Sequence, residues 1–347
     1  MELSDSRYRK QMLFRGIGTN GQQRLLESSV LIVGCGALGC VAADAMTRAG
    51  VGHIRIVDRD FVELSNLQRQ ILFTEEDAAL QTPKAIAAAE RLRRVNSEIQ
   101  IEPHVADVDC SNISAFAGGC QLILDGTDNF EVRYLINDVS LELGIPWIFT
   151  GCTGSHGQIM PIFPGRSACL RCLMNSPPPH GSTQTCDTAG VLGPAIGVVA
   201  SLQAAIALRI LAEGEATAVP LKMTVVDVWD GTFRQMDISE LRNQTDCPAC
   251  RRGERLWLSG TVRSGSTILC GRNAVQVMPS EKQRISIPEL GRKLEISGEV
   301  TVNPFLVRVK LPESPLEITV FPDGRAIIRG TEDPAVARSL YSRYIGT

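Results

Sequence analysis

The residues best suited to chemistry are four cysteines in two C-x-x-C pairs, Cys169 with Cys172 and Cys247 with Cys250. Each pair places two thiolates on one tight turn, and two such turns complete a tetrahedral Zn²⁺ site with four sulfur ligands. The chain has 11 cysteines, an odd number, so a fully paired disulfide framework is impossible. The first residues also lack the basic and apolar regions of a secretory signal. We therefore expect a cytoplasmic protein with structural zinc.

A glycine-rich turn precedes the cysteines. Gly34, Gly36 and Gly39 follow a short apolar run and open an alanine-rich segment, the order expected of strand, turn and helix. Asp58 comes roughly 20 residues later, at the end of the next apolar run. Such glycines let the backbone approach a phosphate, and a carboxylate at this spacing suits ribose hydroxyls. The turn alone predicts a dinucleotide as readily as ATP.

Cationic side chains soon after Asp58 favour ATP. Asn66, Arg69 and Gln70 lie in the segment S-N-L-Q-R-Q, and Lys84 follows a Thr-Pro pair. The two phosphates of a nicotinamide dinucleotide are already served by the glycine turn, whereas a triphosphate has more charge to neutralise. Either cation alone could be a solvated surface charge, but their order after a glycine turn indicates a triphosphate site.

Acidic and amide side chains follow a third apolar run. Asp128 and Asn129 lie in the sequence D-G-T-D-N, at the predicted carboxyl end of a strand, where open α/β sheets bind ligands. Asp128 is a candidate Mg²⁺ ligand because carboxylate and phosphate oxygens suit that cation. Alternatively, it caps the helix that follows. The chain has no G-x-x-x-x-G-K-[ST] loop, which excludes a Walker-type ATPase.

These residues require a framework of alternating strands and helices. Over residues 1–253 the alternation predicts a Rossmann-like, doubly wound α/β fold with a mainly parallel sheet, held together by the zinc knuckles. A pair of amphipathic helices is expected over 5–26. Residues 254–347 are β-rich and are predicted to form a small α+β domain, which ends in a helix capped by Asp333.

The bulk composition excludes some partners. The chain has 347 residues, and its 35 basic and 38 acidic side chains give a net charge of −3. This balance provides no broad field for nucleic acid or anionic membranes. The stretch 191–212 is apolar and long enough for a membrane span, but it contains Pro194, Gln203 and Arg209, so a buried helix is expected.

Taken in order, the motifs resemble those of the ubiquitin-activating-enzyme superfamily, in particular its bacterial ThiF and MoeB adenylyltransferases. The motifs, between Arg7 and Cys250, are R-Y-x-x-Q, G-C-G-A-L-G, V-D-R-D, S-N-L-Q-R-Q, P-K, G-T-D-N, C-L-R-C, T-C-D-T-A-G and C-P-A-C. The resemblance implies that ATP and Mg²⁺ bind, that the C-terminal glycine carboxylate of a ubiquitin-like sulfur carrier is adenylylated, and that pyrophosphate leaves.

The region after the second cysteine pair resembles the C-terminal extension of some ThiF proteins. This favours a ThiS-like carrier, used in thiamine thiazole synthesis, over a MoaD-like carrier, used for molybdopterin. An NAD-dependent oxidoreductase is a remote alternative. It would explain the glycine turn but would leave Arg69, Lys84 and Asp128 without a shared purpose. A sulfurtransferase or a cysteine desulfurase is a further expected partner.

The resemblance also implies roles for single residues. Asp58 would bind ribose, Asp128 magnesium, and Asn66, Arg69 and Lys84 the phosphates. Gln70, Asn129 and the three glycines complete the expected nucleotide site. Two further positions concern partners. Lys10 stands where relatives usually have an arginine that reaches the triphosphate from the other subunit of a homodimer. Cys186 stands where ThiF relatives have a cysteine that bonds covalently to the carrier, the alternative being an idle thiol.

Overall fold

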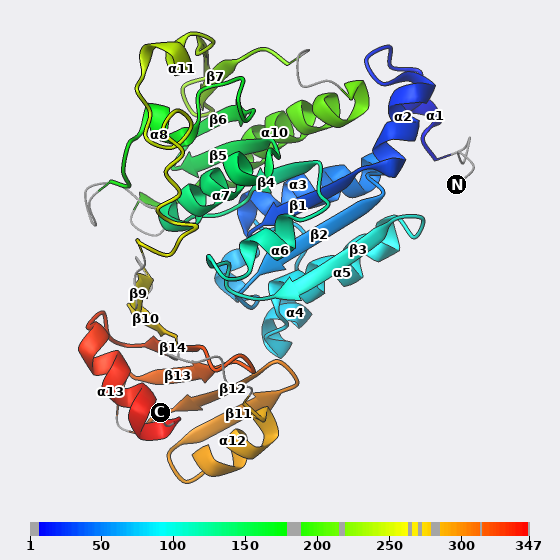
Figure 1. Ribbon diagram of the computed structural model, residues 1–347. Helices are drawn as coiled ribbons and strands as arrows, with labels where there is room; N and C mark the ends of the chain where they lie inside the picture. Colours follow the sequence, from blue (N-terminus) through cyan, green and yellow to red (C-terminus); the bar gives the residue numbers. More distant parts are fainter. Residues whose placement is uncertain are drawn as a thin grey trace. The chain divides into compact units, whose positions relative to one another are not determined.

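The computed structural model describes residues 7–178, 189–214, 219–262, 266–269, 273–278, 285–312 and 314–345. The chain divides into two compact units, residues 1–262 and 263–347 (Figure 1). The stretch 254–262 belongs to the first unit because Trp257 is packed there. Its ring lies 4.5 Å from that of Tyr134, and its backbone N–H donates to Asp138.

The described part of the first unit contains an eight-stranded sheet with the order β3-β2-β1-β4-β5-β6-β7-β8. Parallel pairing joins β1 (Ser29–Val33), β2 (His53–Asp58), β3 (Gln100–Val105), β4 (Leu122–Asp125) and β5 (Trp147–Thr153). Antiparallel pairing adds β6 (His156–Ile162), β7 (Lys222–Asp227) and β8 (Thr232–Asp237). The prediction of a Rossmann-like, mainly parallel sheet is confirmed.

Helices cover both faces of this sheet because its central strands are apolar on both sides. In β1, Val30 and Ile32 join one core and Leu31 and Val33 join the other. The first core includes side chains of α3 (Ala37–Ala49), α5 (Lys84–Val95) and α10 (Gly193–Glu213), and the second those of α6 (Ile113–Ala117), α7 (Phe130–Leu143) and α8 (Leu170–Leu173). Further helical segments among the described residues of the first unit are α1 (Arg9–Met12), α2 (Gly18–Glu27), the 3-10 helix η1 (Leu64–Asn66), α4 (Glu75–Leu80) and α11 (Leu241–Gln244).

Helix α10 is the long apolar stretch seen in the sequence. It is long and apolar enough to cross a membrane, but 56% of its most apolar window is buried in the fold. A Cβ atom added at Gly157 of β6 would lie 2.0 Å from a methyl group of Val199, so the helix packs directly on the sheet. Its apolar composition is therefore that of a core helix, as expected.

The second unit is a two-layer α+β domain. Its antiparallel sheet has the order β11-β12-β13-β14-β10-β9. The core joins the sheet to α12 (Ile287–Leu294) and α13 (Pro334–Tyr344), and Asp333 caps α13 by accepting from the N–H of Ala335, as predicted. The strands are β9 (Ser266–Leu269), β10 (Ala274–Val277), β11 (Glu299–Asn303), β12 (Leu306–Lys310), β13 (Glu317–Val320) and β14 (Ala326–Arg329).

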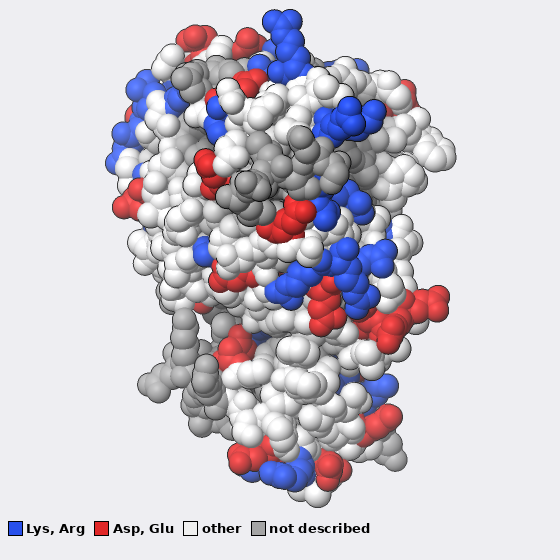
Figure 2. All heavy atoms as spheres, turned by 90° about the vertical axis from the view of Figure 1, so that its right-hand side faces the viewer, with Lys and Arg blue, Asp and Glu red and all other residues white. Residues whose placement is uncertain are grey.

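The surface carries no single-sign field on the face shown in Figure 2. Basic and acidic side chains lie among one another there, in keeping with the small net charge of the sequence. Long-range attraction of a polyanion therefore has no basis on that face.

Candidate nucleotide and metal sites

Two glycines, Gly34 and Gly39, pack the turn after β1 tightly against Gly126, the residue that follows β4. Gly34 has a φ of +86°, and a Cβ atom there would lie 2.8 Å from the carbonyl oxygen of Gly126. A Cβ at Gly39 would lie 2.0 Å from the carbonyl oxygen of Gly34. Gly36, the N-cap of α3, differs, because a Cβ atom added there would lie no nearer than 3.9 Å to another residue. A side chain at position 36 would thus meet no close neighbour at the N-terminus of α3, where the glycine pattern predicts a bound phosphate.

Asp58 holds this turn from the end of β2. Its buried carboxylate accepts hydrogen bonds from the backbone N–H groups of Cys35, at 2.6 Å, and Asp60, at 2.7 Å. Burial raises the pKa of Asp58, while the ammonium of Lys84 and the two backbone donors oppose the rise. The acid predicted to meet a ribose is therefore in direct contact with the glycine turn.

The segment 64–70 lies beside the turn. Gln70 is buried, and its Nε2 atom is 3.9 Å from the position of a Cβ at Gly36. Its Oε1 atom has no hydrogen-bond partner among the described residues. Asn66 is also buried, but its Oδ1 atom accepts from the N–H of Glu63 and so stabilises the local fold. Arg69 is half-buried and donates to the carbonyl of Ser65 at 2.9 Å.

Lys84 is joined to the turn through a carboxylate. Its buried Nζ atom lies 3.3 Å from Oδ2 of Asp60, whose backbone N–H donates to Asp58. The first residue of α5 is therefore linked to the glycine turn through three contacts, by way of Asp60 and Asp58. Because water is largely excluded from this ammonium, its field is screened less than that of a surface lysine.

Asp128 and Asn129 follow β4 and divide two roles between them. Asn129 is the N-cap of α7, since its Oδ1 atom accepts from the N–H of Glu131 at 2.8 Å. The alternative in which Asp128 caps this helix is therefore wrong. Asp128 is exposed, and no hydrogen bond or ion pair to its carboxylate is found within the described ranges. An exposed carboxylate at this edge of the sheet suits Mg²⁺.

A buried ion pair near Asp128 was not predicted from the sequence. Asp125 is fully buried, and its Oδ2 atom lies 3.1 Å from Nε of Arg133. The same arginine donates to the carbonyls of Thr127 and Thr150. Gln203 of α10 reaches the carbonyl of Asp125 from the other face of the sheet. The signal available was an acid at the end of an apolar run followed by an arginine one helical turn into the next helix.

The four cysteines gather in one cluster. Their sulfur atoms all lie within 4.8 Å of one another. The Cys169–Cys172, Cys169–Cys247 and Cys172–Cys250 separations are 3.9, 3.6 and 3.4 Å. A tetrahedron with Zn–S bonds of 2.3 Å has sulfur–sulfur edges of about 3.8 Å, so the cluster fits Zn²⁺. Hydrogen bonding between Cys169 and Cys172 lowers the pKa of Cys172 and raises that of Cys169, so a cation is needed to ionise both thiols together.

One predicted residue, Lys10, is not brought into this site. Lys10 is exposed on α1. The next residue, Gln11, donates a hydrogen bond to the carbonyl of Ala49, which places α1 at the C-terminal end of α3. The 13-residue helix α3 separates that end from Gly36 by about 20 Å. Cys186 lies outside the described residues.

Comparisons with known proteins show which family the chain is similar to. The ThiF family model matches residues 8–249. The chain is 39% identical to the sulfur carrier protein ThiS adenylyltransferase of Bacillus subtilis, over 98% of this chain and 99% of that protein. The Escherichia coli protein of the same name is 38% identical, over 70% of this chain and 94% of that one.

A solved structure shares the fold over most of the chain. The crystal structure of E. coli MccB with ATP superimposes with a TM-score of 0.60 at 20% identity, covering 71% of this chain and 74% of that one. Together with the family match and the close relatives, this confirms the resemblance read from the motifs. The chain belongs to the ThiF family.

Proposed function

We propose that this protein adenylylates the C-terminal glycine carboxylate of a ThiS-like sulfur carrier, using ATP and releasing pyrophosphate. The observation that carries the proposal is the similarity to a ThiS adenylyltransferase over 98% of the chain, including the second unit. The glycine turn with Asp58 and Lys84 supplies a matching phosphate site. A MoaD-like carrier is the alternative substrate for the same reaction.

The chemistry asks for positioning and for positive charge. A carboxylate is already ionised at neutral pH, so attack on the α-phosphate needs no general base. The open N-terminus of α3 at Gly36 would receive the phosphates, with Gln70 beside it. Arg69 and Lys84 would stabilise charge that grows on the phosphate oxygens as pyrophosphate leaves.

Magnesium fits the exposed edge of the sheet after β4. Asp128 would hold it there, since its carboxylate is exposed and Asn129 has taken over the capping of α7. The ion, when bound, would neutralise part of the phosphate charge. Arg133, paired with Asp125, fixes the backbone of this segment because it also donates to the carbonyl of Thr127.

Zinc would have a structural role. The cysteine cluster joins α8 to residues 247–250, which shortly precede the segment 254–262. We propose that all four thiolates bind one Zn²⁺, which leaves no open position for a substrate and makes this a closed structural site.

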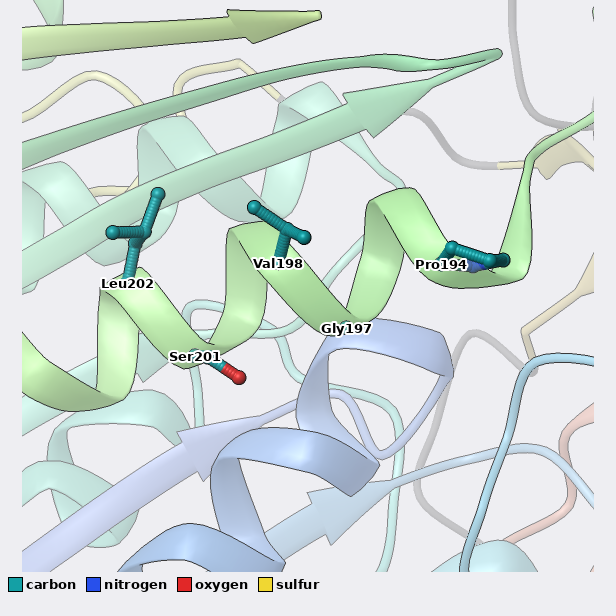
Figure 3. Close-up of a pocket in the computed structure, with 5 residues that line it drawn as sticks. All are labelled: Pro194, Gly197, Val198, Ser201 and Leu202. Carbon is teal, nitrogen blue, oxygen red and sulfur yellow. The ribbon is translucent and has the colours of Figure 1, made fainter. Parts of the chain in front are cut away.

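The protein would act as a homodimer. One face of α10 leaves Pro194, Val198 and Leu202 along an open groove, and Figure 3 shows Val198 and Leu202 projecting on the same side of the helix. Val198 is 40% exposed. A second copy would cover this apolar groove, and Lys10, remote from its own glycine turn, would serve the partner's site.

The remaining assignments concern sulfur transfer. Cys186 would bond to the carrier, with an idle thiol as the alternative, and a cysteine desulfurase or sulfurtransferase would supply sulfur. The reaction would take place in the cytoplasm. Carrier mass spectrometry with and without Cys186→Ser separates the two roles of this thiol.

Carrier-dependent exchange of labelled pyrophosphate into ATP tests the proposed function. We expect exchange with a ThiS-like carrier, weaker exchange with a MoaD-like carrier, and at least about 100-fold less with Asp128→Ala, whose exposed side chain leaves the fold intact. Equal exchange without any carrier would contradict the proposal. A nicotinamide absorbance change in place of exchange would instead support the oxidoreductase alternative.

A further inference from the structure

The fully buried carboxylate of Asp125, at the end of β4, accepts hydrogen bonds through both of its oxygen atoms. Its Oδ1 atom accepts from the backbone N–H of Thr127, at 2.9 Å, and from the Thr127 hydroxyl, at 2.8 Å. Its Oδ2 atom accepts from Nε of Arg133, at 3.1 Å, and from the backbone N–H of Thr150, at 3.2 Å. One buried acid therefore ties the segment that follows β4 to α7 and to β5.

The segment after Asp125 connects the two halves of the proposed nucleotide site. The N–H of Gly126 donates to the last carbonyl of β1, at 2.9 Å, and a Cβ atom at Gly126 would lie 2.3 Å from the carbonyl oxygen of Gly34. Two residues later the same segment reaches Asp128, the proposed magnesium ligand. The path of residues 126–128 therefore determines where the metal-binding carboxylate lies relative to the glycine turn.

Thr127 is the residue through which Asp125 fixes this path. Its N–H and its hydroxyl bind the same carboxylate oxygen, while its carbonyl accepts from a terminal nitrogen of Arg133 at 2.7 Å. Arg133 is itself paired with Asp125, and the carbonyl of Asp125 accepts from Gln203 on α10 at 2.9 Å. Thr127 is thus held through both its donors and its acceptor, so the backbone directly before Asp128 has little freedom to move.

We propose that Asp125 is a positioning residue for the magnesium site, which acts through Thr127 to hold Asp128 at a fixed distance from the glycine turn. The inference rests on the proposed function, which gives Asp128 its role. Residues that orient a metal ligand without touching the ion change metal affinity about 10- to 100-fold when they are replaced. The hydrogen bonds of Asp125 should therefore affect the affinity for the divalent cation, and not only the stability of the fold.

The test removes single hydrogen bonds in this network. Thr127→Val deletes the hydroxyl that donates to Asp125 and keeps the size of the side chain, and Thr127→Ser restores the hydroxyl. Thr150→Val is the matched control, because the Thr150 hydroxyl is buried on β5 and has no hydrogen-bond partner among the described residues. Asp125→Asn is the stronger variant, since its amide nitrogen would face either the donors of Thr127 or Arg133.

Two readouts report on the metal and one on the fold. Binding of Mn²⁺ in the presence of α,β-methylene-ATP is measured from the electron paramagnetic resonance signal of free Mn²⁺, which requires no catalysis. The Mg²⁺ concentration that gives half-maximal pyrophosphate exchange is measured with the carrier present. The urea midpoint of unfolding, measured on the same samples, separates a local effect on the metal from a general loss of stability.

We expect Thr127→Val to weaken Mn²⁺ binding about tenfold and to raise the half-maximal Mg²⁺ concentration by the same factor. Asp125→Asn should have a larger effect, whereas Thr127→Ser and Thr150→Val should match the wild type. Wild-type Mn²⁺ binding by Thr127→Val would overturn the positioning role, whatever the urea midpoint, and leave the proposed function standing. An equal loss in Thr150→Val would overturn it too. The expected Mn²⁺ pattern without carrier-dependent exchange by the wild type would support the positioning of Asp128 and overturn the proposed function.

Discussion

The ammonium of Lys84 lies 3.3 Å from the carboxylate of Asp60, and the backbone of Asp60 in turn donates to Asp58. This chain of contacts joins Lys84 and Asp58, the residues proposed to bind phosphate and ribose, to the glycine turn. The side chain of Lys84 is 4% exposed and that of Asp60 is 17% exposed, so the pair depends on both partners.

Lys84→Ala should therefore lose both activity and stability. It removes the proposed phosphate cation, and it leaves Asp60 with one charge partner fewer in a largely buried site, which costs about 3 kcal/mol. Lys84→Met combined with Asp60→Asn should recover most of the stability without recovering pyrophosphate exchange. Urea unfolding and exchange assays on the same samples separate the two effects. Recovered exchange in the double variant would show that Lys84 is only structural.

Gly39→Ala should unfold the turn, whereas Gly36→Ala should not. The added methyl group meets the carbonyl of Gly34 at 2.0 Å in the first case and nothing nearer than 3.9 Å in the second. We expect Gly39→Ala to cost about 3 kcal/mol of unfolding free energy. Gly36→Ala should keep the wild-type Tm but weaken ATP binding, as measured by calorimetry, because phosphates would approach that position. Equal stability of both variants would contradict this account of the turn.

Zinc removal should destabilise the first unit. Metal analysis should find one Zn²⁺ per chain, and Cys247→Ser should abolish it. Losing the metal should lower Tm by about 10 °C, since each kcal/mol corresponds to roughly 2–4 °C at this size. Cys110→Ser, at a half-buried thiol outside the cluster, is the control and should retain the metal. Zinc-free protein with an unchanged Tm would refute a structural role.

Asp58 should give the stability a specific pH dependence. Burial raises its pKa in the folded protein, so the carboxyl group binds its proton more tightly there than in the unfolded chain. Its contribution to stability is therefore largest below about pH 4, the unfolded pKa, and is lost as the pH rises through the folded pKa. Asp58→Asn should gain stability relative to wild type between pH 4 and pH 7 in urea titrations. A constant difference across that range would contradict the pKa direction.

Lys10 offers a test of the dimer. If it serves the partner's site, a mixture of Lys10→Ala and Asp128→Ala chains, each inactive alone, should form heterodimers with one intact site. Random pairing of equal amounts gives half heterodimers with one working site of two, which is about a quarter of wild-type exchange. A mixture as inactive as its components would remove Lys10 from the catalytic machinery.

Most of the fold could be predicted from the sequence because its signals are local. Continuous apolar runs such as those of β1 and β4, buried on both faces, identify central parallel strands. Strand β8 could not be identified in this way. All of its residues are exposed, so no alternation of apolar and polar side chains marks it. The helix α12 was also missed, being only eight residues long.

The site shows the same division. The glycines, Asp58 and the cysteine pairs are recognisable because a turn or a metal demands these residue types at fixed spacing. The Asp125–Arg133 pair and the Asp60 carboxylate were missed, since their roles come from tertiary contacts between elements. The Asp227 carboxylate likewise joins two turns that are far apart in the chain, since it accepts from the Ser155 hydroxyl and from the backbone N–H of Trp229.

The central claim is the capture of AMP by a carrier's C-terminal carboxylate. Intact-mass spectrometry of a ThiS-like carrier, incubated with the protein, ATP and Mg²⁺, tests it most directly. We predict a carrier heavier by one AMP, absent when Asp128→Ala replaces the wild type and absent when the carrier's last glycine is removed. An unmodified carrier under conditions in which the wild type consumes ATP, or an AMP adduct on the carrier lacking its terminal glycine, would contradict the account.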